Sequence, residues 1–333
     1  MTTSATGPTA TPLPGSRLIG VGHYQPEKTL TNDDLAQMVE TNDEWIQQRT
    51  GIKTRHIAAD DETVATMATL AAEAALSDAQ LRGSDVDLIV VASCTATDRS
   101  PSTAGRVSVA IGATAPAIFD LNAACSGFAH ALAVADQAIR AGAATTALVI
   151  GAEKLSEYTD WTDRTTCILV ADAAGAFVLQ RSDTRGVSDV TWGSEPELAD
   201  AVLIESPTMK FAQDGKSVFK WAISQAADYA RKAVETAGYD MSEIRALVAH
   251  QANRRIIEPL AKQLQLDDAI IAVDITDSGN TSAASIPMAF SKLWHAGELP
   301  EDVPVLLYGF GGGFAYAGQV VRTPTRATNG NGH

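Results

Sequence analysis

The sequence predicts an α/β fold in which central β-sheets are covered by helices on both faces. Short runs rich in β-branched residues alternate with alanine-rich segments of helical period, as in layered α/β proteins. Two of the expected strands run without a polar break, which is typical of strands buried on both faces. The order strand, turn, helix, strand also occurs twice along the chain, which suggests a duplication.

The expected elements follow one another in a regular order. Strands are expected at residues 86–92, 146–151, 175–180, 245–250, 305–310 and 315–322. Helices are expected at residues 62–76, 103–111, 126–141, 218–236, 255–264 and 283–296. The duplication would relate the strand at 86–92 to the strand at 245–250. Spacing recurs between the halves but residue identity does not, so the pattern alone leaves the duplication open.

Length and composition indicate a globular protein. The 333 residues suffice for one large domain or two of about 150 residues. The ends are rich in Thr, Pro, Gly and Asn, so we expect a disordered extension at 1–15 and a flexible tail at 323–333. The chain lacks a signal-peptide pattern and any apolar run of about 18 residues, so we expect a cytoplasmic protein that does not enter a membrane.

Charge restricts the partners. Twenty-five basic residues against 40 acidic ones give a formal net charge of −15. This charge repels phosphate backbones and anionic lipids, so we expect no nucleic-acid binding.

Three cysteines, Cys94, Cys125 and Cys167, form no CxxC pair, so neither a disulfide framework nor a zinc site is expected. Cys125, in AACSGF, lies at the start of an apolar helix. Helix N–H groups and the helix dipole favour a thiolate there, which predicts a lowered pKa and a nucleophile. The alternative is a small buried thiol. Cys94 and Cys167 lie in β-like runs, where a structural role is favoured.

Two further residues lie where catalytic side chains often occur. His250 ends an apolar strand, and ligands of α/β sheets gather at such ends; a structural histidine is the alternative. Asn280 follows a Ser-Gly turn and precedes a helix, and local turn chemistry is its alternative role. The glycines of GFGGGF (309–314) precede a strand, which excludes a dinucleotide loop. They indicate either close backbone approach to a substrate or a plain tight turn.

Taken together, AACSGF, HQANRRI, SGNTSAASIP and GFGGGF resemble the β-ketoacyl-ACP synthase III family of the thiolase superfamily. The resemblance extends through TNDEWIQQRTGIKTRHIA and DWTDRTT and covers nearly all of residues 17–322. It implies a duplicated thiolase fold, five-layered αβαβα with two central mixed sheets, and a homodimer. The half at 16–182 would carry the nucleophile, and the half at 183–322 would carry His250 and Asn280.

The resemblance also implies a reaction. Cys125 would take the acyl group of an acyl-CoA, and His250 and Asn280 would then stabilise the enolate formed when malonyl-ACP loses carbon dioxide. Attack of this carbanion on the acyl-Cys gives a 3-oxoacyl-ACP that starts a fatty-acid or polyketide chain. The backbone N–H groups of Cys125 and Gly312 would hold the second oxyanion. Acyl-CoA is a substrate here, and neither a cofactor nor a metal is expected.

Binding residues follow from the same resemblance. Trp45, Arg49 and Arg164 match the clamp around the CoA adenine, and Asn253 matches a residue that contacts the pantetheine arm. An acidic carrier protein would need a local basic face on this acidic chain. That face is expected at Lys216, Lys220, Arg254, Arg255 and Lys262, with a solvated helix surface as the alternative.

Two positions depart from the family pattern. Ser100 and Val170 stand where many members carry phenylalanines that limit the acyl pocket. Their smaller side chains predict a roomier pocket that prefers a branched, longer or bulkier starter to acetyl.

Two other functions remain open. A relative of the same fold could pass the acyl group from Cys125 to a hydroxyl or amine without decarboxylation. A non-catalytic carrier-protein-binding partner would be expected to have lost Cys125, His250 or Asn280, and this chain retains all three.

Overall fold

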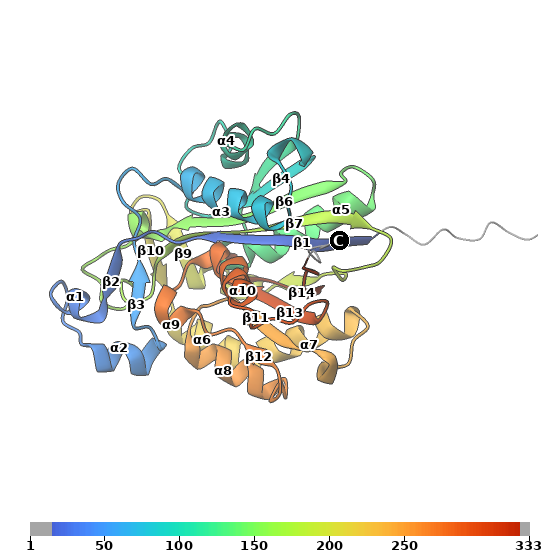
Figure 1. Cartoon of the computed structure of the whole chain (residues 1–333). Helices are drawn as coiled ribbons and strands as arrows, with labels where there is room; N and C mark the ends of the chain where they lie inside the picture. The colour runs from blue at the N-terminus through green and yellow to red at the C-terminus, as the bar shows by residue number, and fades with distance from the viewer. Residues whose placement is uncertain (1–14, 327–333) are drawn as a thin grey trace, which may run out of the picture.

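Two five-stranded sheets lie on either side of a central helical layer, and further helices cover their outer faces (Figure 1). The structure is a computed structural model that describes residues 15–326. It confirms the predicted α/β class and its five layers. Residues 1–14 and 327–333, which belong to the expected extension and tail, lie outside the described residues. Within residues 15–326, none of the helices has the length and apolar character needed to span a membrane.

The two sheets have the same strand order and the same strand directions. The first, in the order β1-β7-β6-β4-β5, comprises β1 (Gly15–Tyr24), β4 (Leu88–Ala92), β5 (Ala117–Leu121), β6 (Thr146–Lys154) and β7 (Asp172–Ser182). The second, in the order β8-β14-β13-β11-β12, comprises β8 (Thr191–Ser194), β11 (Ala246–Ala249), β12 (Ile270–Ile271), β13 (Pro304–Phe310) and β14 (Ala315–Arg322). In each, the last three strands are parallel and the first two alternate in direction. The duplication suggested by spacing is therefore real.

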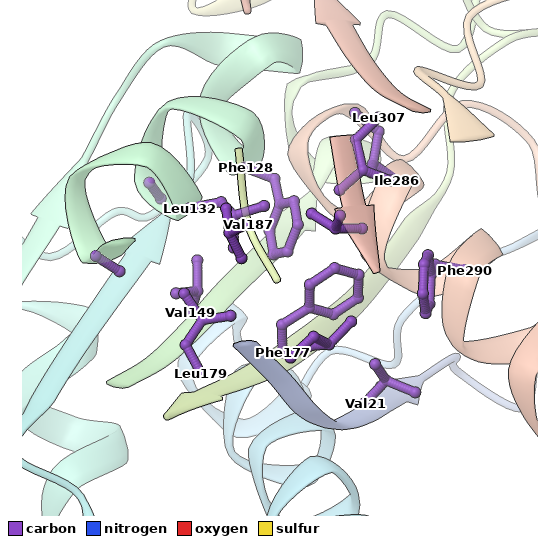
Figure 2. Close-up of a cluster of buried hydrophobic side chains, with 14 of the residues drawn as sticks. Val21, Phe128, Leu132, Val149, Phe177, Leu179, Val187, Ile286, Phe290 and Leu307 are labelled. Atoms are coloured by element: carbon purple, nitrogen blue, oxygen red, sulfur yellow. The ribbon is translucent and has the colours of Figure 1, made fainter. Parts of the chain in front are cut away.

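The middle layer consists of α5 (Gly127–Arg140) and α10 (Ser285–His295), which contact both sheets. Figure 2 shows the core that they share with the strands. The Phe177 ring on β7 packs edge-on against Phe128 and against Phe290, with ring centroids 4.9 Å apart in both pairs. Burial of each ring contributes about 1.5–3 kcal/mol. The apolar faces of α5 and α10 thereby tie the two halves together.

The outer layers complete the sandwich. The first sheet is covered by α3 (Val64–Asp78) and α4 (Thr103–Ala110), and the second by α6 (Gly215–Ser224), α7 (Ala226–Thr236) and α8 (Arg254–Gln263). Smaller elements flank the layers: β2 (Thr29–Thr31), α1 (Asn32–Ala36), α2 (Asp43–Thr50), β3 (Thr54–His56), β9 (Val202–Glu205), β10 (Lys210–Gln213) and α9 (Ile275–Ser278).

Two expectations need correction. The helix expected at 218–236 is two helices, because the backbone leaves the helical path at Gln225 (φ −131°). This break lets the rings of Trp221 and Tyr229 both pack on the ring of Tyr316. Their ring centroids lie 6.2 and 4.1 Å from the Tyr316 centroid. The flexible tail does not start at 323. Thr323 is buried. Its backbone N–H donates to the Val303 carbonyl and its hydroxyl donates to the Pro300 carbonyl, so the chain stays packed on the fold one residue beyond β14.

Candidate active site

Cys125 lies in a short 3₁₀ turn, η2 (Ala124–Ser126), that leads directly into α5. The turn begins at Ala124 in the left-handed conformation (φ 44°), and the Ser126 hydroxyl closes it by donating to the Ala123 carbonyl at 2.8 Å. The Cys125 side chain is only 8% exposed. The sequence correctly located the cysteine at a helix start, but a 3₁₀ turn separates it from the first residue of the α-helix.

The expected low pKa of this thiol is wrong. Burial raises the pKa of Cys125 to about 11, because an ionised sulfur would lose its hydration. The Ser282 hydroxyl and the backbone N–H groups of Gly312 and Cys125 lower the pKa and so oppose part of this effect, whereas the nearby Glu153 raises it further. The resting side chain is therefore a thiol, and it would have to lose its proton to act as the predicted nucleophile.

His250 follows directly after β11 and is 2% exposed. Its backbone N–H donates to the Tyr308 carbonyl at 2.8 Å, which anchors it to β13. The ring atom Nδ1 lies 2.8 Å from Ser285 Oγ, and that oxygen already accepts the Gln251 N–H at 3.3 Å. Ser285 is thus free to donate its own proton to Nδ1, which assigns the hydrogen to Nε2. Burial lowers the pKa of His250 to about 3, so the ring is a neutral N–H donor.

Asn280 is held by backbone and side chain. Its N–H donates to Leu169 at 2.8 Å and its carbonyl accepts from Ala171 at 2.9 Å, so the loop is clamped to the segment before β7. Its Oδ1 accepts the Ser282 N–H at 2.9 Å. The amide orientation is then determined, and the Nδ2 hydrogens are the groups left for a ligand.

A single cavity of about 620 Å³ brings these groups together. Cys125 from the first half and His250 and Asn280 from the second all line it. Apolar side chains, among them Phe310 and Phe314, form much of the remaining wall. A thiol and two neutral N–H donors therefore share one chamber with both apolar and polar walls, which is suited to acyl transfer through an oxyanion.

The glycine turn after β13 closes over the nucleophile. A Cβ on Gly311 would lie 2.5 Å from the Cys125 Cβ and 2.9 Å from its sulfur. The close approach requires glycine for lack of space, since the Gly311 backbone is extended (φ 170°). Of the two roles that the sequence left open for GFGGGF, the structure favours close backbone approach, although the contact is with Cys125 itself.

The residues expected to bind CoA gather at one end of the cavity. The guanidinium carbons of Arg49 and Arg164 lie 5.4 and 4.7 Å from the centre of the Trp45 ring. Arg49 and Asn253 line the cavity. Asn253 also caps α8, accepting the Arg255 N–H at 2.9 Å and donating to the Arg49 carbonyl at 3.1 Å. The structure thus brings all four together, and their roles remain predictions.

The five basic residues expected to dock a carrier protein are exposed on α6 and α8. The helices pack together, with the Arg255 guanidinium 5.1 Å from the Phe219 ring. Lys216 and Arg255 also line the cavity. Arg254 is paired with Glu258 at 2.6 Å, which reduces its share of the positive charge. The face borders the cavity, and its docking role remains a prediction.

The two expected pocket residues are not among those that line the cavity of this chain. Ser100 is exposed in the loop before α4, and Val170 is fully buried beside Asn280, with which it forms a β-bridge. The expected acyl-pocket role of each stays a prediction.

Sequence reasoning missed the side chains that support the site. Ser285 orients His250, while Ser282 holds the Asn280 amide oxygen through its backbone N–H and donates its hydroxyl to the buried Glu153. Cys94 was assigned to a strand but lies in the loop after β4, where its sulfur is 3.3 Å from Glu153. Cys167 was also expected in a β-like run, but it lies in a turn that precedes β7. The only sequence feature that could have pointed to Cys94 and Glu153 was their position near the end of a strand, where the functional residues of α/β sheets gather.

Comparison with known proteins identifies the family. The profile of 3-oxoacyl-[acyl-carrier-protein (ACP)] synthase III matches residues 119–196, and the profile of its C-terminal region matches residues 234–323. The chain is 54% identical over 313 residues to β-ketoacyl-[acyl-carrier-protein] synthase III 2 of Streptomyces avermitilis, covering 93% of this chain and 99% of that relative. It is 44% identical over 318 residues to β-ketoacyl-[acyl-carrier-protein] synthase III of Rhodospirillum centenum, covering 92% and 98%.

Solved structures agree. The priming β-ketosynthase of the R1128 polyketide pathway superposes with a TM-score of 0.92 at 35% identity, covering 96% of this chain and 99% of that one. The 3-oxoacyl-[acyl-carrier-protein] synthase III of Aquifex aeolicus gives a TM-score of 0.89 at 41% identity, covering 92% and 100%. The resemblance first noted in the motifs thus extends along the whole fold, and the chain belongs to the β-ketoacyl-[acyl-carrier-protein] synthase III family.

Proposed function

We propose that this protein is a condensing enzyme that starts a fatty-acid or polyketide chain. Cys125 takes the acyl group from an acyl-CoA and releases CoA. Malonyl-ACP then binds and loses carbon dioxide, and its carbanion attacks the acyl-Cys carbonyl; the bond from carbonyl carbon to Cys125 sulfur breaks, which gives a 3-oxoacyl-ACP and returns Cys125 to its thiol after it takes up a proton. The observation that carries this proposal is the convergence of Cys125, His250 and Asn280 on one cavity.

The two donors suit decarboxylation. Decarboxylation of a malonyl thioester places negative charge on the thioester oxygen, so catalysis needs hydrogen-bond donors aimed at that atom. His250 offers Nε2–H and Asn280 offers Nδ2–H, each fixed by a bond on its other side. Because the pKa of His250 is lowered to about 3, its ring donates without carrying a charge that would favour the malonyl carboxylate. Both donors therefore favour the enolate over the ground state.

The second oxyanion forms on the acyl-Cys carbonyl. The backbone N–H groups of Gly312, in the turn after β13, and of Cys125, in η2, both lower the pKa of the Cys125 thiol, which is consistent with donors close to the sulfur. We assign these two groups to that oxygen. Loss of one oxyanion donor costs on the order of 10²–10³ in rate.

The raised pKa of Cys125 adds a requirement. At neutral pH the sulfur is protonated, so the thiol proton passes to the departing CoA sulfur as the new carbon–sulfur bond forms and the old one breaks, and CoA leaves as a free thiol. The apolar wall favours this concerted route, because a free thiolate in the cavity would be poorly solvated.

Two neighbouring groups of residues beside the cavity are proposed to receive the substrates. The Trp45, Arg49 and Arg164 cluster is proposed to hold the CoA nucleotide, and the basic face on α6 and α8 to dock the acidic carrier protein. Reversing the charge of Lys262, which is exposed, should raise the KM for malonyl-ACP and leave acylation by acyl-CoA unchanged. An unchanged KM would remove Lys262 from the docking face.

We also propose a cytoplasmic homodimer. The three cysteines are free thiols, which suits a reducing compartment. Within the described residues β5 pairs only with β4, and its Ile118 and Phe119 are 42% and 38% exposed. A second copy would cover this edge. Phe119→Asp should shift the sedimentation coefficient toward the monomer, whereas an unchanged value would exclude this interface.

The deciding experiment has two steps. Intact-mass measurement after incubation with acyl-CoA should show one acyl adduct, which Cys125→Ala abolishes and Cys167→Ala, a matched buried-thiol control, retains. Carbon dioxide release from malonyl-ACP should then require Asn280. No adduct would leave carrier-protein binding as the function. An adduct without carbon dioxide release would favour transfer to a hydroxyl or amine.

A further inference from the structure

A positive charge lies completely buried beside the loop that carries Asn280. Arg55, on β3, is 0% exposed. Within residues 15–326 no carboxylate forms an ion pair with its guanidinium. Burial lowers the pKa of Arg55 to about 10, and the charge of Asp34, at longer range, opposes only part of this effect, so the group still carries its charge at neutral pH. A buried charge without a counter-ion is costly, so its retention calls for an explanation.

The guanidinium is held by two backbone carbonyls. Its Nη2 donates to the Ile168 carbonyl at 3.0 Å and its Nη1 to the Leu30 carbonyl at 3.2 Å, while Nε has no partner in the part of the chain that the structure describes. The bond to Leu30 joins two strands, β2 and β3, that already pair along their backbones. The bond to Ile168 instead reaches the segment 166–171 that precedes β7, so it is the contact that distinguishes Arg55.

Ile168 belongs to the segment on which Asn280 is fixed. The Asn280 N–H donates to the Leu169 carbonyl at 2.8 Å, and the Asn280 carbonyl accepts the Ala171 N–H at 2.9 Å. The Ile168 and Leu169 carbonyls belong to neighbouring peptide planes that share the Leu169 Cα, so a donor that fixes the first restricts the second. Ile168 and Leu169 also line the cavity. The guanidinium therefore holds the segment to which the Asn280 backbone is bonded.

Arg55 also lies against the turn that leads into Asn280. Gly279, the residue before Asn280, has a left-handed backbone (φ 73°), and a Cβ there would lie 3.0 Å from the Arg55 Cβ. The strand that carries Arg55 holds the preceding helix α9 as well, since Thr54 Oγ1 donates to the Asp277 carbonyl at 2.7 Å. Both backbone flanks of Asn280 are thus in contact with β3 or with a group that Arg55 holds.

We propose that Arg55 is a positioning residue for Asn280: it packs against the turn before Asn280, and its guanidinium fixes the Ile168 carbonyl, so that the carboxamide keeps its place in the cavity wall. The role rests on the proposed function, in which the Asn280 Nδ2–H holds the enolate oxygen. A guanidinium suits the task because it presents several donors in one rigid plane to carbonyls of separate segments. Arg55 does not line the cavity, so it acts through the loop.

The two steps of the proposed reaction should respond differently to loss of this support. Acylation of Cys125 by acyl-CoA does not use the Asn280 carboxamide, whereas release of carbon dioxide from malonyl-ACP does. A displaced Asn280 loop should therefore slow the second step and spare the first. A general loosening of the fold would slow both, because the acylation step also needs a well-packed cavity.

Arg55→Met tests this difference. Methionine keeps an unbranched side chain beside Gly279 and removes every donor. The kcat for carbon dioxide release from malonyl-ACP should fall about 10- to 100-fold, because a misplacement of about 1 Å at a reacting centre costs about 10²-fold in rate. The rate of Cys125 acylation, followed by intact mass with acyl-CoA, should stay within about threefold of the parent. A parental kcat, or an equal loss of both rates, in folded protein would overturn the proposal.

Asp136→Asn is the matched control. Asp136 is a buried charged side chain on α5 that accepts from Ser16 Oγ at 2.7 Å, and neither residue lines the cavity. Its replacement should lower the melting temperature and leave the rates of both steps within about threefold of the parent. A selective loss of carbon dioxide release in this variant would mean that general destabilisation explains the effect of Arg55→Met, and the proposal would fail.

Hydrogen exchange of Arg55→Lys gives a second test that needs no substrate. This milder variant keeps the charge but loses the planar fork, so it is informative even if Arg55→Met does not fold. Peptides spanning 166–172 and 276–284 should exchange faster than in the parent, and the β6 peptide should not change. Unchanged exchange in both loop peptides would overturn the proposal. If the parent released no carbon dioxide, the proposed function would fail, and the exchange result would still show whether Arg55 holds the loop.

Discussion

Gly311→Ala is the sharpest perturbation of the nucleophile that the structure offers. The added methyl carbon would lie 2.5 Å from the Cys125 Cβ, 2.9 Å from its sulfur and 3.1 Å from its backbone nitrogen. Carbon atoms prefer separations of about 3.5–4.0 Å, so Cys125 or the glycine turn must move by about 1 Å. Because Gly311 is extended (φ 170°), alanine causes no backbone strain, and the effect acts entirely through this contact.

The displacement determines the size of the effect. A shift of about 1 Å at a reacting centre costs about 10²-fold in rate, or about 2.7 kcal/mol in the activation free energy. Overpacking of this kind lowers the free energy of unfolding by about 1–3 kcal/mol. We therefore expect the acylation rate of Cys125, followed by intact mass with acyl-CoA in excess, to fall about 100-fold in protein that remains folded by circular dichroism.

Gly313→Ala in the same turn provides the control. Gly313 has φ 67°, which strains alanine by about 1–2 kcal/mol, but its Cβ would meet no atom within 4 Å. It should lower stability and leave the acylation rate within about threefold of the parent. Equal loss of acylation in both variants, or a parental rate in Gly311→Ala, would refute the steric explanation.

Three further predictions concern binding, specificity and pH. Trp45→Ala should raise the KM for acyl-CoA about tenfold, since stacking contributes about 1–3 kcal/mol, and should leave the KM for a short pantetheine thioester unchanged. In a competition among acyl-CoAs, the small Ser100 and Val170 should favour bulky starters, and a strong acetyl preference would contradict this. Burial lowers the pKa of His23 to about 4 and of His250 to about 3, so the unfolded chain binds more protons below about pH 6.5. The free energy of unfolding should fall by up to about 1.4 kcal/mol per pH unit for each ring as the pH drops from 6.5 to about 4, and urea titrations showing no such fall would contradict it.

The central layers could be predicted because their residues are continuously apolar. β4, β6 and β13 are buried along their whole length, and the bounds of each differ by only a few residues from those of the strand expected from the sequence. The edges carried no such signal. β5 is largely exposed and contains Asp120, and β12 has only two residues, so neither stands out from a loop. β1 has three glycines, and the close packing of two of them, Gly20 and Gly22, on α3 becomes evident only in the fold.

The site was predictable in its members but not in its electrostatics. Cys125, His250 and Asn280 each occupy a turn at an element end, which sequence can locate. The pKa of Cys125 depends on burial in the folded chain, which the local sequence does not report. The argument from the helix start therefore predicted a lowered pKa where burial raises it. Glu153 and Ser282 are 129 residues apart in the chain, so their contact is equally invisible to local patterns.

Duplication explains why three distant segments meet. Each half has a 3₁₀ turn before its central helix, η2 before α5 and η6 (Ser282–Ala284) before α10, and each turn begins with a left-handed residue. Each turn also packs on a glycine of the other half's sheet. A Cβ on Gly151 of β6 would lie 2.3 Å from the Ala283 carbonyl, and one on Gly309 of β13 would lie 3.0 Å from the Ser126 Cα.

This reciprocal packing gives the two turns different tasks. The first carries the proposed nucleophile, and the equivalent turn in the second half supplies Ser282, whose hydroxyl donates to Glu153 of the first half at 2.9 Å. Because the strand glycines lack side chains, the turns approach closely enough for a hydrogen bond to cross from one half to the other. A larger residue at Gly151 would meet Ala283 and Ala284 and so displace the second turn, together with the hydrogen bond from Ser282 to Glu153, whereas the first turn packs on Gly309.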